Sequence, residues 1–139
     1  MLIERIVNDH KTQAEVAAGT LIFTFLAHLG RHQDIHYQIA NVAMTIETTA
    51  FVAALLSEGL KDRVPQLSRI LGWAAVTSLI LTGACYGAVV LTDVNYALYF
   101  AHDHGITNPF DLYNFTTQEL LPDFTRDVAN GVKQLSGQP

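Results

Sequence analysis

Charged residues are scarce in this sequence. Asp, Glu, Lys and Arg make up 15% of the 139 residues, against about 25% in an ordinary soluble domain. The net charge is -5, and the eight Lys and Arg residues are scattered along the chain. Because phosphate binding requires a clustered basic surface, we expect no nucleic-acid partner.

Several motifs that carry catalysis are also missing. The single cysteine, Cys85, excludes an intrachain disulfide. The chain has no HExxH or CxxC pattern, no glycine-rich phosphate loop and no nucleophile elbow. Ser57, Ser68 and Ser78 have no His and Asp partners that the sequence suggests. We therefore do not expect a hydrolase.

The sequence contains two long apolar runs. Residues 70–91 are 22 residues without a charge, enough to cross a hydrocarbon core of about 30 Å at about 1.5 Å per residue. Residues 37–56 carry one charge, Glu47, at their middle. Pro65 suits the first turn of a helix and Gly59 the end of the preceding one. The pattern predicts two spans joined by a short turn.

A third, less apolar run covers residues 14–29. Upstream of it, Ile3, Ile6 and Val7 keep helical spacing. Together they predict one long helix that enters the bilayer from an amphipathic stretch.

The remaining segment, residues 92–139, is polar and acidic. Thr116 and Glu119 have the spacing of a capping box at the start of a helix. Leu121, Phe124, Val128 and Leu135 would form one apolar stripe on that helix. The fold class is therefore predicted as all-α, a single integral membrane helical bundle (residues 1–139) with about three transmembrane helices and a C-terminal amphipathic helix. The alternative is a soluble helical bundle with residues 70–91 at its centre.

The distribution of basic residues predicts an orientation. With three spans, the N-terminus and the second loop carry five Lys and Arg residues, and the first loop and the tail carry three. By the positive-inside rule, the N-terminus is cytoplasmic and the C-terminal segment lies outside.

The histidines are the first candidates for chemistry. This topology places five of the six histidines on the outer side. His32 and His36 are spaced i, i+4, so a helix would present both imidazoles in one direction, as metal sites require. His102 and His104 follow the last span, and the set predicts a metal or haem-edge site. Otherwise, these histidines simply populate a membrane interface.

Glu47 is the second candidate. It follows His36 by eleven residues, three helical turns, so both lie on one face of the second span. A carboxyl at this depth must be protonated or paired, which suits a proton or ion relay or a hydrogen bond to a quinone. The alternative is that Glu47 holds helices together through a hydrogen bond to a Thr or Asn.

Small residues form a face on the third span. Gly83 and Gly87 are spaced i, i+4, which allows another helix to approach closely. This spacing indicates helix association.

Three functions follow from these features. The first is an accessory or structural subunit of a membrane complex, respiratory complexes included, or of a homo-oligomer, with the lipid membrane and other membrane subunits as partners. The second is a membrane redox or transport protein that uses Glu47 and the histidines to handle a metal, haem, quinone or protons. The third is the soluble bundle.

Overall fold

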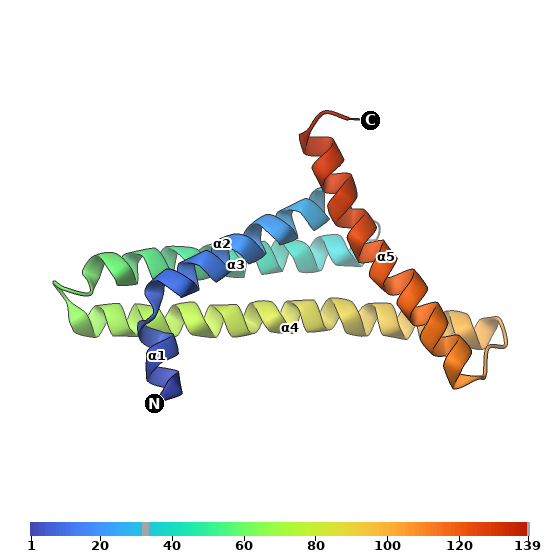
Figure 1. Ribbon diagram of the computed structural model, residues 1–139, viewed down its shortest axis with the longest axis horizontal. Helices are drawn as coiled ribbons and strands as arrows, with labels where there is room; N and C mark the ends of the chain where they lie inside the picture. Colours follow the sequence, from blue (N-terminus) through green and yellow to red (C-terminus); the bar gives the residue numbers. More distant parts are fainter. Residues whose placement is uncertain (32–33, 139) are drawn as a thin grey trace.

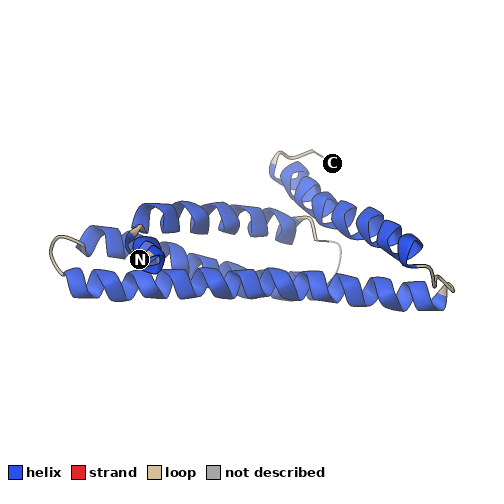
Figure 2. Ribbon diagram, turned by 60° about the horizontal axis from the view of Figure 1, so that its bottom comes forward, coloured by secondary structure: helices blue, strands red, loops and turns tan. Residues whose placement is uncertain are grey.

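The chain folds into five α-helices, four of them long (Figure 1; Figure 2). In chain order they are α1 (Leu2–Asn8), α2 (His10–Leu29), α3 (Asp34–Leu60), α4 (Pro65–Asp103) and α5 (Pro109–Leu135). The computed structural model describes residues 1–31 and 34–138 and their side chains, except those of residues 34, 116, 117 and 119–124. No strand occurs in these ranges. The predicted all-α fold class is confirmed.

Helices α3 and α4 form an antiparallel hairpin, with α2 packed along α3 (Figure 1). Pro65 stands in the first turn of α4, where a missing N–H removes no helical hydrogen bond. The amides of Arg63 and Val64 donate to the carbonyl of Leu60 over 3.1 and 2.8 Å and close the turn. The short turn predicted between Gly59 and Pro65 is confirmed.

Two helices are long and apolar enough to cross a membrane. These are α3, from Ile35 to Leu60, and α4. Helix α2, which contains the predicted span 14–29, is not among them. At 39 residues, α4 is about 58 Å long and continues past the start of α3, so that its last turns leave the bundle (Figure 1).

The side chains of this bundle are sorted by size as well as by polarity. Among the described residues, eight of the nine buried apolar side chains are alanines, and the ninth is Val7. Large apolar side chains point outward instead, with Ile80 68% and Leu91 70% exposed. Small residues and polar groups inside, with bulky apolar groups outside, are typical of helices that pack together within hydrocarbon.

The N-terminal region differs from the prediction of one long helix. The helix is interrupted at Asp9: α1 ends at Asn8, and α2 begins at His10. The break is stabilised locally, because Asp9 Oδ1 accepts a hydrogen bond from the amide of Thr12 over 3.2 Å. Gln13 Nε2 donates to the carbonyls of Ile6 and Val7 and secures α1 against the start of α2. As a result, α1 lies across α4 (Figure 1).

The capping box predicted at Thr116 and Glu119 is wrong. Helix α5 begins seven residues earlier, at Pro109, and the side chain of Asn108 caps it by accepting from the amide of Phe110 over 2.8 Å. An Asn cap followed by Pro at the first helical position is a stronger start signal than an internal Thr. Apolar and polar residues of α5 alternate with helical periodicity, so the predicted amphipathic C-terminal helix is confirmed.

Helix α5 turns back and crosses the end of α2 at two glycines. A Cβ atom on Gly131 would overlap the carbonyl oxygen of Leu26, and one on Gly30 would overlap that of Asp127. The two backbones therefore touch at this crossing, which no other residue type permits without displacement. By contrast, a Cβ on Gly83 or Gly87 would meet nothing within 4 Å.

We predict that Gly131→Ala weakens the attachment of α5. The added methyl group must push α2 and α5 apart, at a cost of about 1–3 kcal/mol in the free energy of unfolding. Denaturant titration in detergent, followed by circular dichroism, measures it. Gly19→Ala is the matched control, since it makes the same change on α2 where a Cβ meets nothing within 4 Å, and it should be neutral or stabilise by about 0.5–1 kcal/mol. Equal effects of both substitutions would contradict the close crossing.

Candidate functional site

Polar side chains inside the bundle form three groups at successive levels of α3. We call them the serine layer (His10, Ser57, Ser68), the glutamate layer (Thr24, Glu47, Tyr86) and the histidine layer (His36, Asp93, Asp127). Each layer joins at least three helices, and nearly all of its members are less than a tenth exposed. Buried polar groups persist only when they are hydrogen-bonded, so the contacts of each layer need to be followed atom by atom.

The glutamate layer lies at the middle of α3. Glu47 is 0% exposed. Thr24 Oγ1 lies 2.9 Å from Glu47 Oε1, and the Tyr86 hydroxyl lies 3.4 Å from the same oxygen and hydrogen-bonds to Thr24. The second oxygen, Oε2, has no hydrogen-bond partner among the described residues. The Glu47 carboxyl group thus links α2, α3 and α4 through Oε1, and its Oε2 atom makes no hydrogen bond with the described residues.

The histidine layer lies near the start of α3. His36 Nε2 is 2.8 Å from Asp93 Oδ1 on α4, and His36 Nδ1 is 4.0 Å from Asp127 Oδ2 on α5. The imidazole therefore has a carboxylate on each side, an arrangement that orients the ring. Helices α3, α4 and α5 meet at this one side chain.

A small cavity separates these two layers. Its volume is about 30 Å³, room for about two water molecules. Thr24 and Tyr86 line one part, His36 and Asp127 line another, and the remaining walls are mostly alanine and aliphatic side chains. Polar side chains of the glutamate and histidine layers thus line one cavity, and we call the two layers together the polar line.

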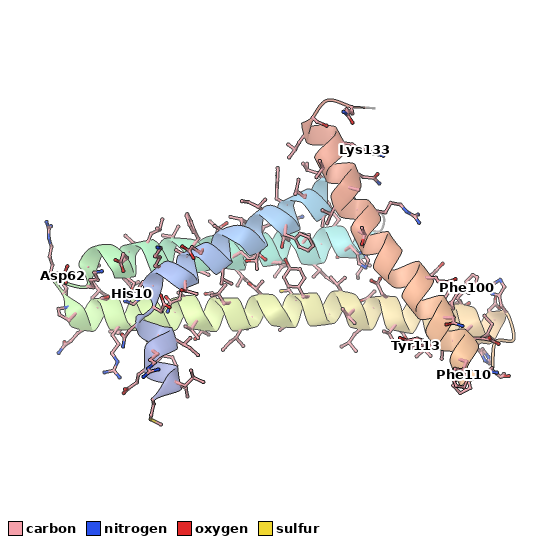
Figure 3. All side chains as sticks on the ribbon, viewed as in Figure 1. His10, Asp62, Phe100, Phe110, Tyr113 and Lys133 are labelled. Carbon is pink, nitrogen blue, oxygen red and sulfur yellow. The ribbon has the colours of Figure 1, made fainter. Side chains whose placement is uncertain are left out.

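The serine layer stands apart at the opposite end. Ser57 Oγ lies 2.9 Å from His10 Nδ1, and Ser68 Oγ lies 3.3 Å from His10 Nε2. Each serine hydroxyl is also within hydrogen-bond distance of the other serine's backbone carbonyl. The expectation that Ser57 and Ser68 lack a histidine partner is wrong, because His10, at the start of α2 (Figure 3), lies within hydrogen-bond distance of both hydroxyl groups. Their carbonyl contacts indicate a structural tie between α2, α3 and α4.

Alanines fill the bundle between the serine and glutamate layers. Ala50, Ala53 and Ala54 of α3 and Ala75 of α4 are buried there, and no polar group of α3 interrupts them. Glu47 and Ser57 are ten residues apart along α3, about 15 Å. On α3 the polar line therefore ends at Glu47. On α4 the buried Thr82 follows one turn beyond Tyr86, and its hydroxyl donates to the backbone carbonyl of Ser78.

The structure does not gather the histidines predicted to bind a metal. His32 lies outside the described residues. His36 pairs with Asp93, whereas His102 is nine residues further along α4, about 14 Å away. His104 stacks on Phe100 and contacts its carbonyl, and Phe100 lies near the far end of α4 (Figure 3). Within the described part of the chain, no three His, Cys, Asp or Glu side chains are placed to bind one metal ion.

The sequence placed Glu47 and His36 on one face but missed Asp93 and Asp127. A signal for Asp93 existed: His36 stands 24 residues before the end of α3, and Asp93 stands 28 after the start of α4. In an antiparallel hairpin, two residues at similar distances from the turn, one on each helix, lie at similar heights along the pair. Asp127 had no comparable signal, because the return of α5 onto α2 depends on its crossing at Gly30 and Gly131.

Comparisons with protein-family models, with curated proteins and with solved structures found no match to this chain.

Proposed function

We propose that this chain is a small integral membrane subunit that binds protons at Glu47. The protons reach Glu47 from one side of the membrane through His36. The observation that carries this proposal is the buried Glu47 carboxyl, whose hydrogen-bond partners Thr24 and Tyr86 line a water-sized cavity together with His36. An intramembrane ionisable residue is costly and is retained mostly for ion or proton handling.

The membrane placement rests on α3 and α4 and on their outward apolar side chains. Helix α2 is the third proposed span, because Thr24 reaches Glu47 and so lies at the same depth as the middle of α3. With spans at residues 14–29, 37–56 and 70–91, five basic residues flank the inner side and three the outer side. The N-terminus is then cytoplasmic, and the C-terminal segment is outside.

The orientation has a direct test. With Cys85 replaced by Ala, Ser136→Cys should react with an impermeant maleimide in intact cells, because the tail faces outward. A second variant, Asp62→Cys in the α3–α4 turn, should react only after lysis. Labelling of the turn and protection of the tail would reverse the proposed topology.

In this topology, the proton path has a direction. A proton from the outer side reaches the histidine layer, where His36 exchanges it between its imidazole and the flanking carboxylates. Water in the cavity passes it to the glutamate layer, and Glu47 binds it next to the Thr24 and Tyr86 hydroxyls. The alanines beyond Glu47 offer no acceptor, so the proton returns by the same route or leaves through a neighbouring subunit.

A protonated carboxyl group can be followed by infrared spectroscopy of the reconstituted protein. We expect a buried carboxylic-acid carbonyl band that shifts in D₂O and is lost in Glu47→Gln, which keeps shape and hydrogen bonding but cannot titrate. Glu58→Gln is the matched control, since Glu58 is on the same helix but partly exposed beside Lys61. His36→Ala should slow the exchange of the band.

The alternative, in which Glu47 only holds helices together, gives different results. The band would still be lost in Glu47→Gln, but its exchange would be equally fast in His36→Ala, and Glu47→Gln would leave the stability of the bundle unchanged. Glu47→Leu would weaken the bundle by about 1–2 kcal/mol, because its hydroxyl partners lose their acceptor.

A second candidate function is assembly with another membrane helix. It is favoured because Gly83 and Gly87 form an exposed face on α4 that no other described part of the chain covers. No side chain or backbone of the described residues lies within 4 Å of a Cβ built on either glycine. Both positions are exposed on the predicted span 70–91. Another copy of the chain, or a different membrane subunit, could approach there, and this would also supply the exit that Glu47 lacks.

Substitution of this face should disrupt assembly. We expect Gly83→Ile and Gly87→Ile to shift the protein, purified in mild detergent, to a smaller species on native gels, since a branched side chain keeps helices apart. Ala74→Ile is the control, because Ala74 is exposed on α4 and lies nine residues, about two and a half turns, from Gly83. An unchanged species in both glycine variants would remove this interface.

A further inference from the structure

Helix α1 has one apolar and one polar half. With about 3.6 residues per turn, its apolar side chains fall on one half of its surface (Leu2, Ile3, Ile6, Val7), and its polar side chains fall on the other (Glu4, Arg5, Asn8). The bundle covers only one edge of the apolar half, because Val7 is 1% exposed, whereas Leu2 is 73% and Ile3 is 55% exposed. Most of this half is therefore left uncovered by the described part of the chain.

The crossing of α1 and α4 lies at one end of the proposed span. A Cβ atom on Gly72 would overlap the carbonyl oxygen of Val7, so the two backbones touch there. Gly72 is the third residue of the predicted span 70–91. The axis of α1 runs across α4 and not along it (Figure 1). Since the proposed function places α4 across the bilayer, α1 lies along the membrane surface nearest the α3–α4 turn.

Two contacts indicate how α1 is rotated about its own axis. Glu4 Oε1 lies 3.8 Å from Arg69 Nη2, and Arg69 precedes Gly72 on α4, on the side of the α3–α4 turn. Both side chains of this ion pair are 60% exposed, so the pair indicates orientation more than stability. Ile6 lines a groove with Val76, which follows Gly72 toward the middle of the span. The polar half of α1 thus faces the aqueous side, and the apolar half faces the interior of the proposed membrane.

The residues of α4 around the crossing are typical of a membrane–water boundary. Trp73, the single tryptophan of the chain, follows Gly72 and is 45% exposed. Tryptophan is enriched where the acyl chains of a bilayer meet the headgroups. Arg69 stands one turn before Trp73, and Ile70 between them is 64% exposed. The uncovered apolar half of α1 therefore continues onto the outward apolar surface of α4, which the proposed function places in lipid.

The charges on this side of the bundle balance. Residues 1–15 and 58–69 contain five basic and five acidic side chains. Three of the basic side chains lie within 4.0 Å of an acidic one (Lys11, Lys61, Arg69). The region thus has no net side-chain charge that would select an anionic or a cationic partner. Its apolar half is suited to the boundary between headgroups and acyl chains, whatever the headgroup charge.

We propose that α1 is an in-plane membrane anchor. Leu2, Ile3 and Ile6 insert among the lipids at the membrane surface nearest the α3–α4 turn, and the polar half of α1 remains in water. The partner is the bilayer itself, with any headgroup charge. The anchor rests on the membrane placement of the proposed function and does not depend on proton binding at Glu47.

The anchor sets the depth of the bundle in the bilayer. Helix α1 is attached to α2 through Gln13, whose Nε2 donates to the carbonyls of Ile6 and Val7 over 2.6 and 3.0 Å. It is attached to α4 at the close contact with Gly72. A surface helix joined to two spans in this way resists their movement along the membrane normal. Glu47 is thereby kept at the middle of the bilayer.

The experiment uses the full chain reconstituted in vesicles of choline phospholipid. In a Cys85→Ala background, a nitroxide label is attached at Ile3→Cys, at Ile6→Cys or, as the matched control on the polar half, at Asn8→Cys. Circular dichroism of each variant checks that its helices are intact. Electron paramagnetic resonance then measures collisions of each label with lipid-soluble oxygen and with a water-soluble nickel complex. We expect the ratio of oxygen to nickel collisions to be several-fold higher at positions 3 and 6 than at position 8.

Three results would overturn the anchor. The first is an equal ratio at the three positions. The second is exclusion of both reagents from positions 3 and 6, because a protein such as a second copy of the chain would then cover this face. The third is insertion that occurs only when part of the lipid is replaced by an anionic phospholipid. The balanced charges predict that this replacement leaves the ratios unchanged.

The single tryptophan separates this proposal from the proposed function. Fluorescence of Trp73 should be quenched more strongly by lipids brominated near the headgroup than by lipids brominated near the end of the acyl chain. No quenching by either lipid would remove the membrane placement and the anchor together. Stronger quenching by the deeply brominated lipid would place the crossing inside the bilayer and contradict the anchor. Shallow quenching of Trp73 with water-exposed labels at positions 3 and 6 would remove only the anchor.

Discussion

The hydrogen bond between Thr24 and Glu47 is the contact on which the bundle depends most. It joins α2 to α3 at the middle of the most apolar part of the chain, and Tyr86 adds α4 to the same carboxyl group. A carboxyl group at that depth is tolerated only if protein groups replace the water it has lost. The three helices must therefore pack in the one register that brings these side chains together, and the alanines around Glu47 allow that packing because they keep the backbones close.

The same requirement governs the other polar layers. His36 holds α3, α4 and α5 through two carboxylates, and His10 holds α2, α3 and α4 through two serines. The polar contacts thus determine which helices pack together and in which register, while the buried apolar side chains among the described residues are nearly all alanines. In the proposed membrane placement, lipid supplies no hydrophobic drive between helices that are apolar outside, and close packing and interhelical hydrogen bonds take over that role.

Glycines act where backbones touch, and their spacing alone does not reveal where that is. The i, i+4 pair at Gly83 and Gly87 faces open space within the chain, whereas Gly30 and Gly131, a hundred residues apart, meet at the crossing of α2 and α5. The crossing positions Asp127 beside His36. The crossing at Gly30 and Gly131, which have no repeated spacing in the sequence, therefore completes the histidine layer. The regularly spaced Gly83 and Gly87 contact no other helix in the described part of the chain and are open to a partner.

What the sequence by itself determined is the two long apolar helices α3 and α4, the turn between them and the position of Glu47 at the middle of α3. Long uncharged runs can only be helices if they lie in lipid, Pro65 and Gly59 mark the turn, and helical periodicity puts His36 and Glu47 on one face. Only the tertiary structure decided what these side chains meet. The break at Asp9, the partners Asp93 and Asp127, and the separation of His36 from His102 and His104 all arise from contacts between distant segments. Helix periodicity acts over a few residues, whereas the pairing of buried polar groups depends on how whole helices are placed against one another.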